Sequence, residues 1–153
     1  MAQGKEILVQ YKRESADVHW LDLGSKAMSP IRIDYSGLPN EERGGAPSQL
    51  LCASLTYCVA ATFATALTGR GATIKSMTAR GVLEQDRDAS QRMKVARLRV
   101  EVAVEVGEAD IETFEKCRRI MSHGCRIGYS LQQGIAVEET YRRIEPLNHR
   151  EIE

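Results

Sequence analysis

Residues 47–69, PSQLLCASLTYCVAATFATALTG, form an uncharged stretch that limits what the rest of the chain can fold into. Arg43 and Arg70 are the nearest charged residues on its two sides. Pro47 is tolerated in a first helical turn, where its missing N–H would have no partner. Gly69 stands where helices commonly end. The stretch therefore predicts one long apolar helix, around which the other elements must pack.

Two of the four cysteines lie on this helix and point in different directions. Leu51, Leu55, Cys58 and Thr62 follow the i, i+4, i+7, i+11 spacing, so they are expected to share one face. Cys52 lies about 240° away from Cys58 around the helix axis, so one straight helix cannot join them in a disulfide. Composition alone favours a small buried hydrophobe as the role of Cys58.

Length, charge and the start of the chain narrow the class of protein. The chain has 153 residues, and its 21 basic residues balance its 21 acidic ones, so no net field favours nucleic acid. We expect a single domain over residues 1–145 and a mobile charged tail over 146–153. The first residues lack an apolar signal core, which favours the cytoplasm. The Ser, Thr and Gln content of residues 47–69 favours a buried helix over a membrane span.

The spacing of the cysteines does not fit a metal site. Cysteines at 52, 58, 117 and 125 contain no C-x-x-C pair and have few histidines nearby, so zinc is disfavoured and no cofactor is expected. In a reducing compartment, a structural disulfide framework is also disfavoured.

His123 lies two residues before Cys125 and could act as a base, although a surface histidine is the commoner case.

Alternating patterns place strands on both sides of the helix. Strands are predicted at Glu6–Lys12, Ala16–Leu23, Pro30–Tyr35, Thr73–Gln85, Ala96–Val106 and Ile135–Ile144. Residues 86–91 predict a turn, and 96–106 show the clearest alternation of apolar and charged side chains. Helices are predicted over residues 109–122 and 125–133. This order of elements predicts an α+β domain.

Two cysteine contexts resemble a known family. Gly44-Gly45-x-Pro47 leading into LLCASLTYC, and the second cysteine in HGCRIGYSLQQGIAVE, resemble the stress-response family of osmotically inducible and organic hydroperoxide resistance proteins, OsmC/Ohr. The resemblance runs from about residue 44 to 144. It implies an intertwined homodimer, in which two long central helices pack together and antiparallel sheets wrap around them.

The resemblance also implies a chemistry for Cys58 and Cys125. Cys58 matches the helix cysteine that attacks the peroxide bond and becomes a sulfenic acid. Cys125 matches the resolving cysteine that forms a disulfide with it, which an external dithiol then reduces. A nearby thiol protects a sulfenic acid from over-oxidation. Because Cys125 is expected at a helix N-terminus beside Arg126, we expect its thiol to be partly ionised at neutral pH.

The resemblance thus implies a thiol-dependent, peroxiredoxin-type oxidoreductase acting on organic hydroperoxides. In the peroxidase branches, a glutamate follows the proline at the helix start and pairs with an arginine; here that position is Ser48. Arg13, Arg32 and Arg43 are the candidates for the arginine. Loss of the glutamate leaves an alternative, a dimer with little peroxidase activity that binds a small apolar or thiol-reactive ligand at the subunit interface. Cys52 and Cys117 match no family role.

Overall fold

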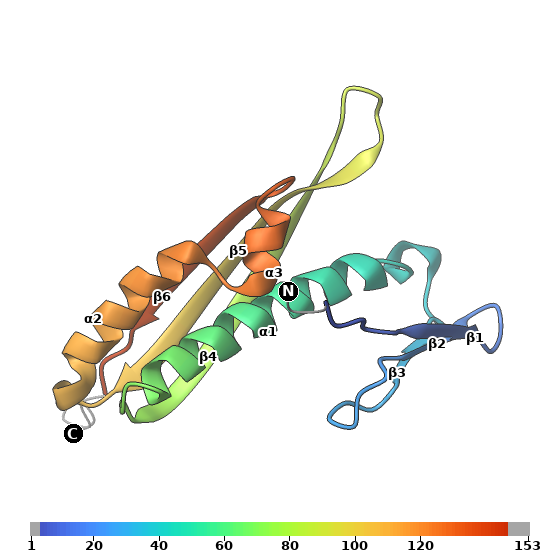
Figure 1. The fold of residues 1–153 in the computed structure, drawn as a ribbon. Helices are drawn as coiled ribbons and strands as arrows, with labels where there is room; N and C mark the ends of the chain where they lie inside the picture. Colours follow the sequence, from blue (N-terminus) through green and yellow to red (C-terminus); the bar gives the residue numbers. More distant parts are fainter. Residues whose placement is uncertain (1–3, 147–153) are drawn as a thin grey trace, which may run out of the picture. The chain divides into compact units, whose positions relative to one another are not determined.

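A computed structural model describes residues 4–146, which divide between Pro47 and Ser48 into two compact units (Figure 1). The order of elements is the predicted one: three strands, a long helix, two strands, a helix pair and a last strand. The chain is therefore α+β, with one long helix and two three-stranded sheets. The single domain expected over residues 1–145 stays a prediction, and residues 147–153 of the expected tail lie outside the described residues.

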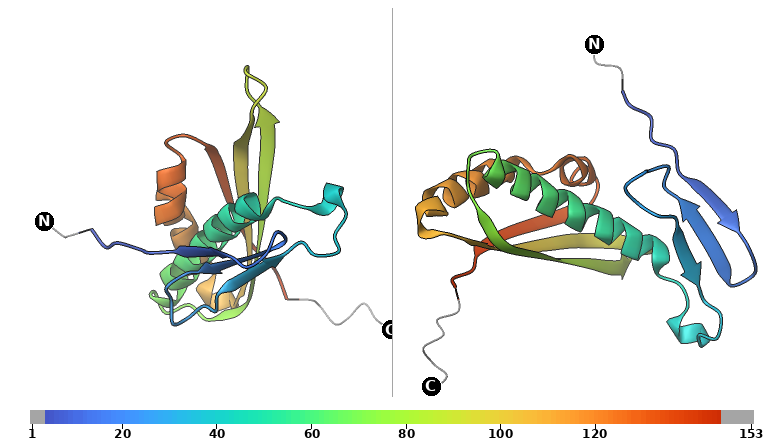
Figure 2. Two further views of the ribbon diagram at one scale, coloured as in Figure 1. Left: turned by 90° about the vertical axis from the view of Figure 1, so that its right-hand side faces the viewer. Right: turned by 90° about the horizontal axis from the view of Figure 1, so that it is seen from below.

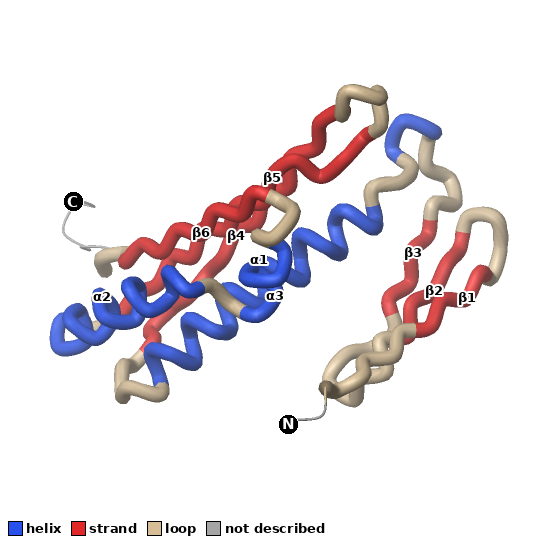
Figure 3. Tube along the Cα trace, turned by 45° about the horizontal axis from the view of Figure 1, so that its top comes forward, coloured by secondary structure: helices blue, strands red, loops and turns tan. Residues whose placement is uncertain are grey.

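The first unit is a small antiparallel meander (Figure 3). Its strands β1 (Gln10–Arg13), β2 (Val18–Asp22) and β3 (Ile31–Asp34) pair in the order β1-β2-β3, and a short 3-10 helix, η1 (Asn40–Glu42), follows. The first strand begins later than predicted. Gln10 pairs with Asp22, the last residue of β2, so the residues before Gln10 have no strand partner there.

The second unit packs helices on one face of a sheet (Figure 2). Its elements are α1 (Ala46–Thr68), β4 (Ile74–Arg87), β5 (Met93–Val106), η2 (Glu108–Asp110), α2 (Ile111–Ile120), η3 (Met121–His123), α3 (Arg126–Leu131) and β6 (Ala136–Arg143). Within one residue at each end, α1 is the helix predicted from the uncharged stretch. β4 extends two residues into the predicted turn, because its pairing with β5 continues to Arg87 and Met93.

The second sheet corrects the expectation of purely antiparallel sheets. β4 and β5 are antiparallel, but β5 and β6 are parallel. The helical segment between β5 and β6 carries the chain back to the start of β5, which is the crossover that parallel neighbours need. β6 therefore runs beside β5 with Glu139 opposite Val100 and Tyr141 opposite Val102.

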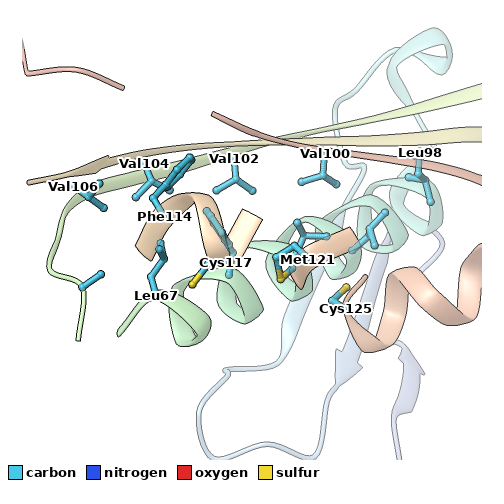
Figure 4. Close-up of a cluster of buried hydrophobic side chains, with 14 residues drawn as sticks. Leu67, Leu98, Val100, Val102, Val104, Val106, Phe114, Cys117, Met121 and Cys125 are labelled. Carbon is cyan, nitrogen blue, oxygen red and sulfur yellow. The ribbon is translucent and has the colours of Figure 1, made fainter. Parts of the chain in front are cut away.

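The core lies between the sheet and the helices (Figure 4). β5 alternates as predicted, and its inward side chains are at most 2% exposed; they are Leu98, Val100, Val102, Val104 and Val106. Phe63 from α1 and Phe114 from α2 meet edge to face with ring centroids 5.6 Å apart. Fully burying side chains of this size stabilises the fold by about 1.5–3 kcal/mol each.

Only one side of α1 contributes to this core. Leu55, Val59, Phe63 and Leu67 are fully buried at four-residue spacing, whereas Thr62, expected on the same face as Leu55, is exposed. On the other side, Tyr57 is 77% exposed.

By length and composition alone α1 could span a membrane. Its buried face, with Leu55, Val59, Phe63 and Leu67, belongs to the same hydrophobic cluster as the inward side chains of β5.

Candidate functional site

Cys58 lies near the middle of α1 and is half-buried. Its side chain packs against the buried cluster that includes Leu55 and Cys125. It therefore lies at the border between the core and the exposed side of the helix. A thiol at such a border is neither sealed in the core nor fully in water, which is the setting in which reactive cysteines occur.

Cys125 lies at the N-cap of α3 and is 2% exposed. The backbone N–H of Gly128 donates a hydrogen bond to its Sγ over 3.3 Å. Gly124, directly before it, has a φ of +75°, which turns the chain from η3 into α3. Cys58 packs against the same buried cluster and raises the pKa of this thiol, so the two cysteines predicted as a pair are neighbours.

The environment of Cys125 raises the pKa of its thiol to about 11. Burial is the largest cause, and hydrogen bonding with the Cys58 side chain adds to it. The Gly128 N–H lowers the pKa, but it does not offset the loss of water. The expectation that the helix N-terminus and Arg126 would leave Cys125 partly ionised at neutral pH is therefore wrong. The helix start is where it was predicted, but burial dominates.

β6 brings a carboxyl group and a phenol to the same place. Glu139 and Tyr141 are in phase with Val137 on the inward side of the strand. The Tyr141 hydroxyl donates a hydrogen bond of 2.6 Å to Oε2 of Glu139. The Tyr141 ring packs against Phe63, with centroids 4.6 Å apart, so the phenol is fixed in the core. Oε1 of Glu139 is buried and has no hydrogen-bond partner among the described residues.

Gly128 is what lets the carboxyl group approach Cys125. A Cβ atom at Gly128 would lie 2.5 Å from Oε1 of Glu139 and 3.4 Å from Sγ of Cys125. The first distance is shorter than real Cβ contacts, so any side chain at this position would displace the carboxyl group of Glu139. Oε1 and Sγ thus flank the same small space, left open by the missing side chain of α3.

Burial shifts the acid–base properties of the two β6 side chains. It raises the pKa of Glu139, against the opposing effect of the hydrogen bond from Tyr141. Burial, together with the hydrogen bond to Glu139, also raises the pKa of the Tyr141 hydroxyl far above its usual range. Tyr141 therefore acts only as a hydrogen-bond donor near neutral pH, while Glu139 is a stronger base than an exposed carboxylate.

A cavity of about 310 Å³ adjoins the site. Gly124, Arg118, Gln132, Glu139 and Tyr141 are among its lining residues. Arg118 is held by Glu115, with a 2.7 Å contact between guanidinium and carboxylate. Glu139 therefore lines this cavity and also lies next to the space beside Cys125.

The other two cysteines have packing roles. Cys117 is fully buried, and its thiol donates to the backbone carbonyl of Ala66 over 3.3 Å. Cys52 is half-buried at the point where α1 passes close to Gly81 of β4. Across residues 4–146, no group of three or more His, Cys, Asp or Glu side chains could hold a metal ion.

The candidate arginines all lie in the first unit. Arg43 pairs with Asp17 over 2.7 Å and also donates to the carbonyl of Leu38. Arg32 pairs with Asp34 on the same strand. Arg13 is the last residue of β1. Two of the three therefore have acidic partners within their own unit.

The start of α1 carries the hydroxyl of Ser48 in place of a carboxylate. The hydroxyl of Ser48 accepts a hydrogen bond of 2.8 Å from the side-chain amide of Gln85 on β4. This contact is neutral and fixes the first helical turn to the sheet. Ser48 therefore has a structural partner on β4.

Comparison with known proteins places the chain in a family. The family model described as OsmC-like protein matches residues 39–140, more than half of the chain. The chain belongs to the OsmC-like family. The match includes α1, both cysteines of the candidate pair and Glu139. No curated protein matches the sequence at a significant level.

Solved structures of OsmC-like proteins share the fold across nearly the whole chain. An OsmC-like protein from Mycoplasma pneumoniae superposes with a TM-score of 0.69 at 14% identity, covering 92% of this chain and 99% of its own. An OsmC-like protein of unknown function from Vibrio cholerae gives 0.68 at 15% identity, covering 92% and 100%. An organic hydroperoxide resistance protein from Elizabethkingia anophelis gives 0.60 at 14% identity, covering 94% and 100%. At these identities the likeness establishes the fold.

Sequence reasoning did not identify Glu139 and Tyr141 as part of the site of this OsmC-like protein. A signal was present, because alternation in IAVEETYRRI puts Glu139 in phase with Val137 and Tyr141. A carboxylate in phase with the buried side of a strand is uncommon and calls for a specific partner. The glycine that makes room for it could not be recognised from the sequence.

Proposed function

We propose that the chain is a thiol-dependent peroxidase that reduces organic hydroperoxides through Cys58 and Cys125. The observation that carries the proposal is the proximity of these two cysteines on α1 and at the start of α3: Cys58 packs against the buried cluster that contains Cys125 and raises the pKa of its thiol. Cys58 attacks the peroxide oxygen, releases the alcohol and becomes a sulfenic acid. Cys125 then displaces water from it and forms a disulfide, which an external dithiol reduces.

Membership in the OsmC-like family supports this chemistry, since one structural neighbour is named an organic hydroperoxide resistance protein and another a putative redox protein. The half-buried position of Cys58 supports the assignment of the attacking thiol. The fully buried Cys125, with a pKa of about 11, is the poorer first nucleophile and suits the resolving role.

The proposal includes a cytoplasmic homodimer. The side of α1 that faces away from the sheet carries no charge, and Tyr57 on it is 77% exposed. An uncharged helix surface of this length is typical of an interface. A second copy of α1 is the proposed partner. Sizing and chemical cross-linking test this part, and a monomer at micromolar concentration would contradict it.

Stopped-flow mixing of the reduced protein with cumene hydroperoxide tests the activity. We expect consumption of the peroxide in the parent protein and none above background in Cys58→Ser. The Cys125→Ser variant is expected to react once and to accumulate a sulfenic acid, which dimedone traps. Mass spectrometry after mild peroxide treatment should find a 58–125 disulfide only in the parent protein. Equal consumption by the parent and Cys58→Ser would overturn the proposal.

A second candidate is a ligand-binding dimer without peroxidase activity. Two observations favour it: the neutral Ser48–Gln85 contact at the start of α1, and an open groove beside Cys52, Tyr57 and Gly81 whose lining is mostly apolar. It predicts no 58–125 disulfide after peroxide treatment. Binding of an apolar fluorescent probe, lost in Ala53→Glu within the groove, would then support it.

A further inference from the structure

The site holds one group that the chemistry above does not use. Oε1 of Glu139 is buried without a hydrogen-bond partner among residues 4–146, although buried polar atoms are almost always paired. Its other oxygen is held by the Tyr141 hydroxyl over 2.6 Å. An unpaired carboxylate oxygen in a site is costly to keep, so it calls for a function.

The free oxygen is directed at the space next to Cys125. A Cβ at Gly128 would have touched both Oε1 and the Cys125 sulfur, so the carboxylate oxygen and the thiol approach the same point, which a side-chain atom of Leu55 also borders. The negative charge of Glu139 also acts on the Cys125 thiol, whose pKa it raises. The carboxyl group, the resolving thiol and the Cys58 thiol therefore form one buried cluster contributed by β6, α3 and α1.

We propose that Glu139, oriented by Tyr141, accepts the proton of the Cys125 thiol when that thiol attacks oxidised Cys58. This inference rests on the proposed function. In the step, the S–H proton of Cys125 moves to Oε1, the Cys125 sulfur bonds to the Cys58 sulfur, and the S–O bond of the sulfenic acid breaks. The leaving hydroxide takes the proton from Glu139 and departs as water. The hydroperoxide, already reduced to an alcohol, has accepted the two electrons lost by the thiols.

The reaction needs such a base because the resolving thiol is nearly always protonated. With a pKa of about 11, only about one Cys125 thiol in 10⁴ is ionised at pH 7. A general base adjacent to the thiol typically contributes about 10²–10⁴-fold in rate. Burial raises the pKa of Glu139, which makes its carboxylate a stronger base than an exposed one.

The described groups next to Glu139 do not offer another base, and His123, two residues before Cys125, is exposed at the end of η3. Tyr141 on the same strand donates its proton to Glu139, and the residue opposite on β5 is Val100. Arg118 of α2 lines the adjoining cavity but pairs with Glu115. Cys58 of α1 and Cys125 of α3 are the reacting thiols themselves. Glu139 is thus the carboxylate next to the space beside Cys125, and the adjoining cavity has no other carboxylate in its described lining.

An aromatic disulfide isolates this step without any peroxide. Dithiobis(nitrobenzoate) labels Cys58 and releases one coloured thiolate; attack by Cys125 on the mixed disulfide then releases a second. The Cys52→Ala background removes the other half-buried thiol. In Glu139→Gln we expect an unchanged first release and a second release slowed about 10²-fold at pH 7. Glu138→Gln, on the exposed side of the same strand, is the matched control and should behave as the parent.

The pH profile separates proton transfer from a structural role. In the parent, the rate of the second release should level off above the pKa of Glu139. In Glu139→Gln it should keep rising towards pH 11, where Cys125 ionises unaided. Tyr141→Phe should shift the parent profile, and Glu139→Asp should restore part of the rate. If Glu139→Gln does not fold, the pH profiles of Tyr141→Phe and Glu139→Asp test the role of Glu139 instead.

The outcomes distinguish the two proposals. If no sulfenic acid forms at Cys58 with hydroperoxide while the second release still depends on Glu139, the peroxidase function fails and the role of Glu139 stands. If Glu139→Gln keeps the parent rate and pH profile, the proposed role of Glu139 is wrong even where peroxide is consumed. A parent protein that releases no second equivalent would also overturn it, because Cys125 would then not attack Cys58.

Discussion

The buried layer between the helices and the second sheet differs in chemistry from one end to the other. At the apolar end, Leu67, Phe114 and Cys117 pack under Val104 and Val106, and the Cys117 thiol reaches only a backbone carbonyl (Figure 4). At the polar end, Cys58 and Cys125 meet Glu139. Both ends contain a buried cysteine, so burial of a thiol does not by itself indicate a reactive one. The two buried cysteines differ in the groups that their sulfur atoms contact.

The largest expected effect is on stability at the apolar end. Phe114→Ala should lower the free energy of unfolding by about 3–5 kcal/mol, because it leaves a cavity beside Phe63. Urea denaturation measures it. Ile120→Ala on the same helix, at a side chain that is 43% exposed, is the control and should cost less than about 1 kcal/mol. Similar losses for both would show that the layer is loosely packed.

A single methyl group should disturb the polar end. Gly128→Ala places a Cβ 2.5 Å from Oε1 of Glu139, so we expect a loss of about 1–3 kcal/mol as the carboxyl group is displaced. In a Glu139→Ala background the same change should cost much less. The double-mutant cycle by urea denaturation measures the coupling. Additive effects of the two changes would contradict the contact.

Removing the thiol at the apolar end should have a small effect. Cys117→Ala deletes one buried atom and should cost about 1 kcal/mol, in the range for a methyl group. The 58–125 disulfide should form at the parent rate, as followed by mass spectrometry. A slower reaction would mean that the two ends of the layer are not independent.

The smallest expected effect is on the pH dependence of stability. The folded protein holds the Glu139 proton more tightly than the unfolded chain, where its pKa is near 4.5. Between that value and the raised folded pKa, the folded state binds more protons, so stability falls as the pH rises. Melting temperatures of Glu139→Gln should lack this slope between pH 4 and 7, whereas Glu138→Gln should keep it. An unchanged slope in Glu139→Gln would assign it to other groups.

The sequence predicted the order of elements, the bounds of α1 within a residue and the inward face of β5, because apolar periodicity and helix-end signals are local. It did not predict the parallel pairing of β6, since strand direction depends on the path of the intervening helices. The proximity of Cys58 and Cys125 came from a family resemblance. Sequence reasoning missed Glu139 because the position of its carboxyl group depends on Gly128, which lies on another element. Gly128 contributes only by having no side chain, which leaves room for that carboxyl group.

The parallel pairing of β6 has a consequence for the time at which the site forms. A hairpin such as β4–β5 closes through a short turn, but a parallel neighbour must wait until the intervening helices have docked. Glu139 and Tyr141 lie on that last strand, and Cys125 lies on the segment that leads to it. During synthesis, α1 emerges long before its partner groups. We expect the thiol pair and its carboxyl group to assemble in the last step of folding, so that an incomplete chain carries Cys58 without the means to resolve it.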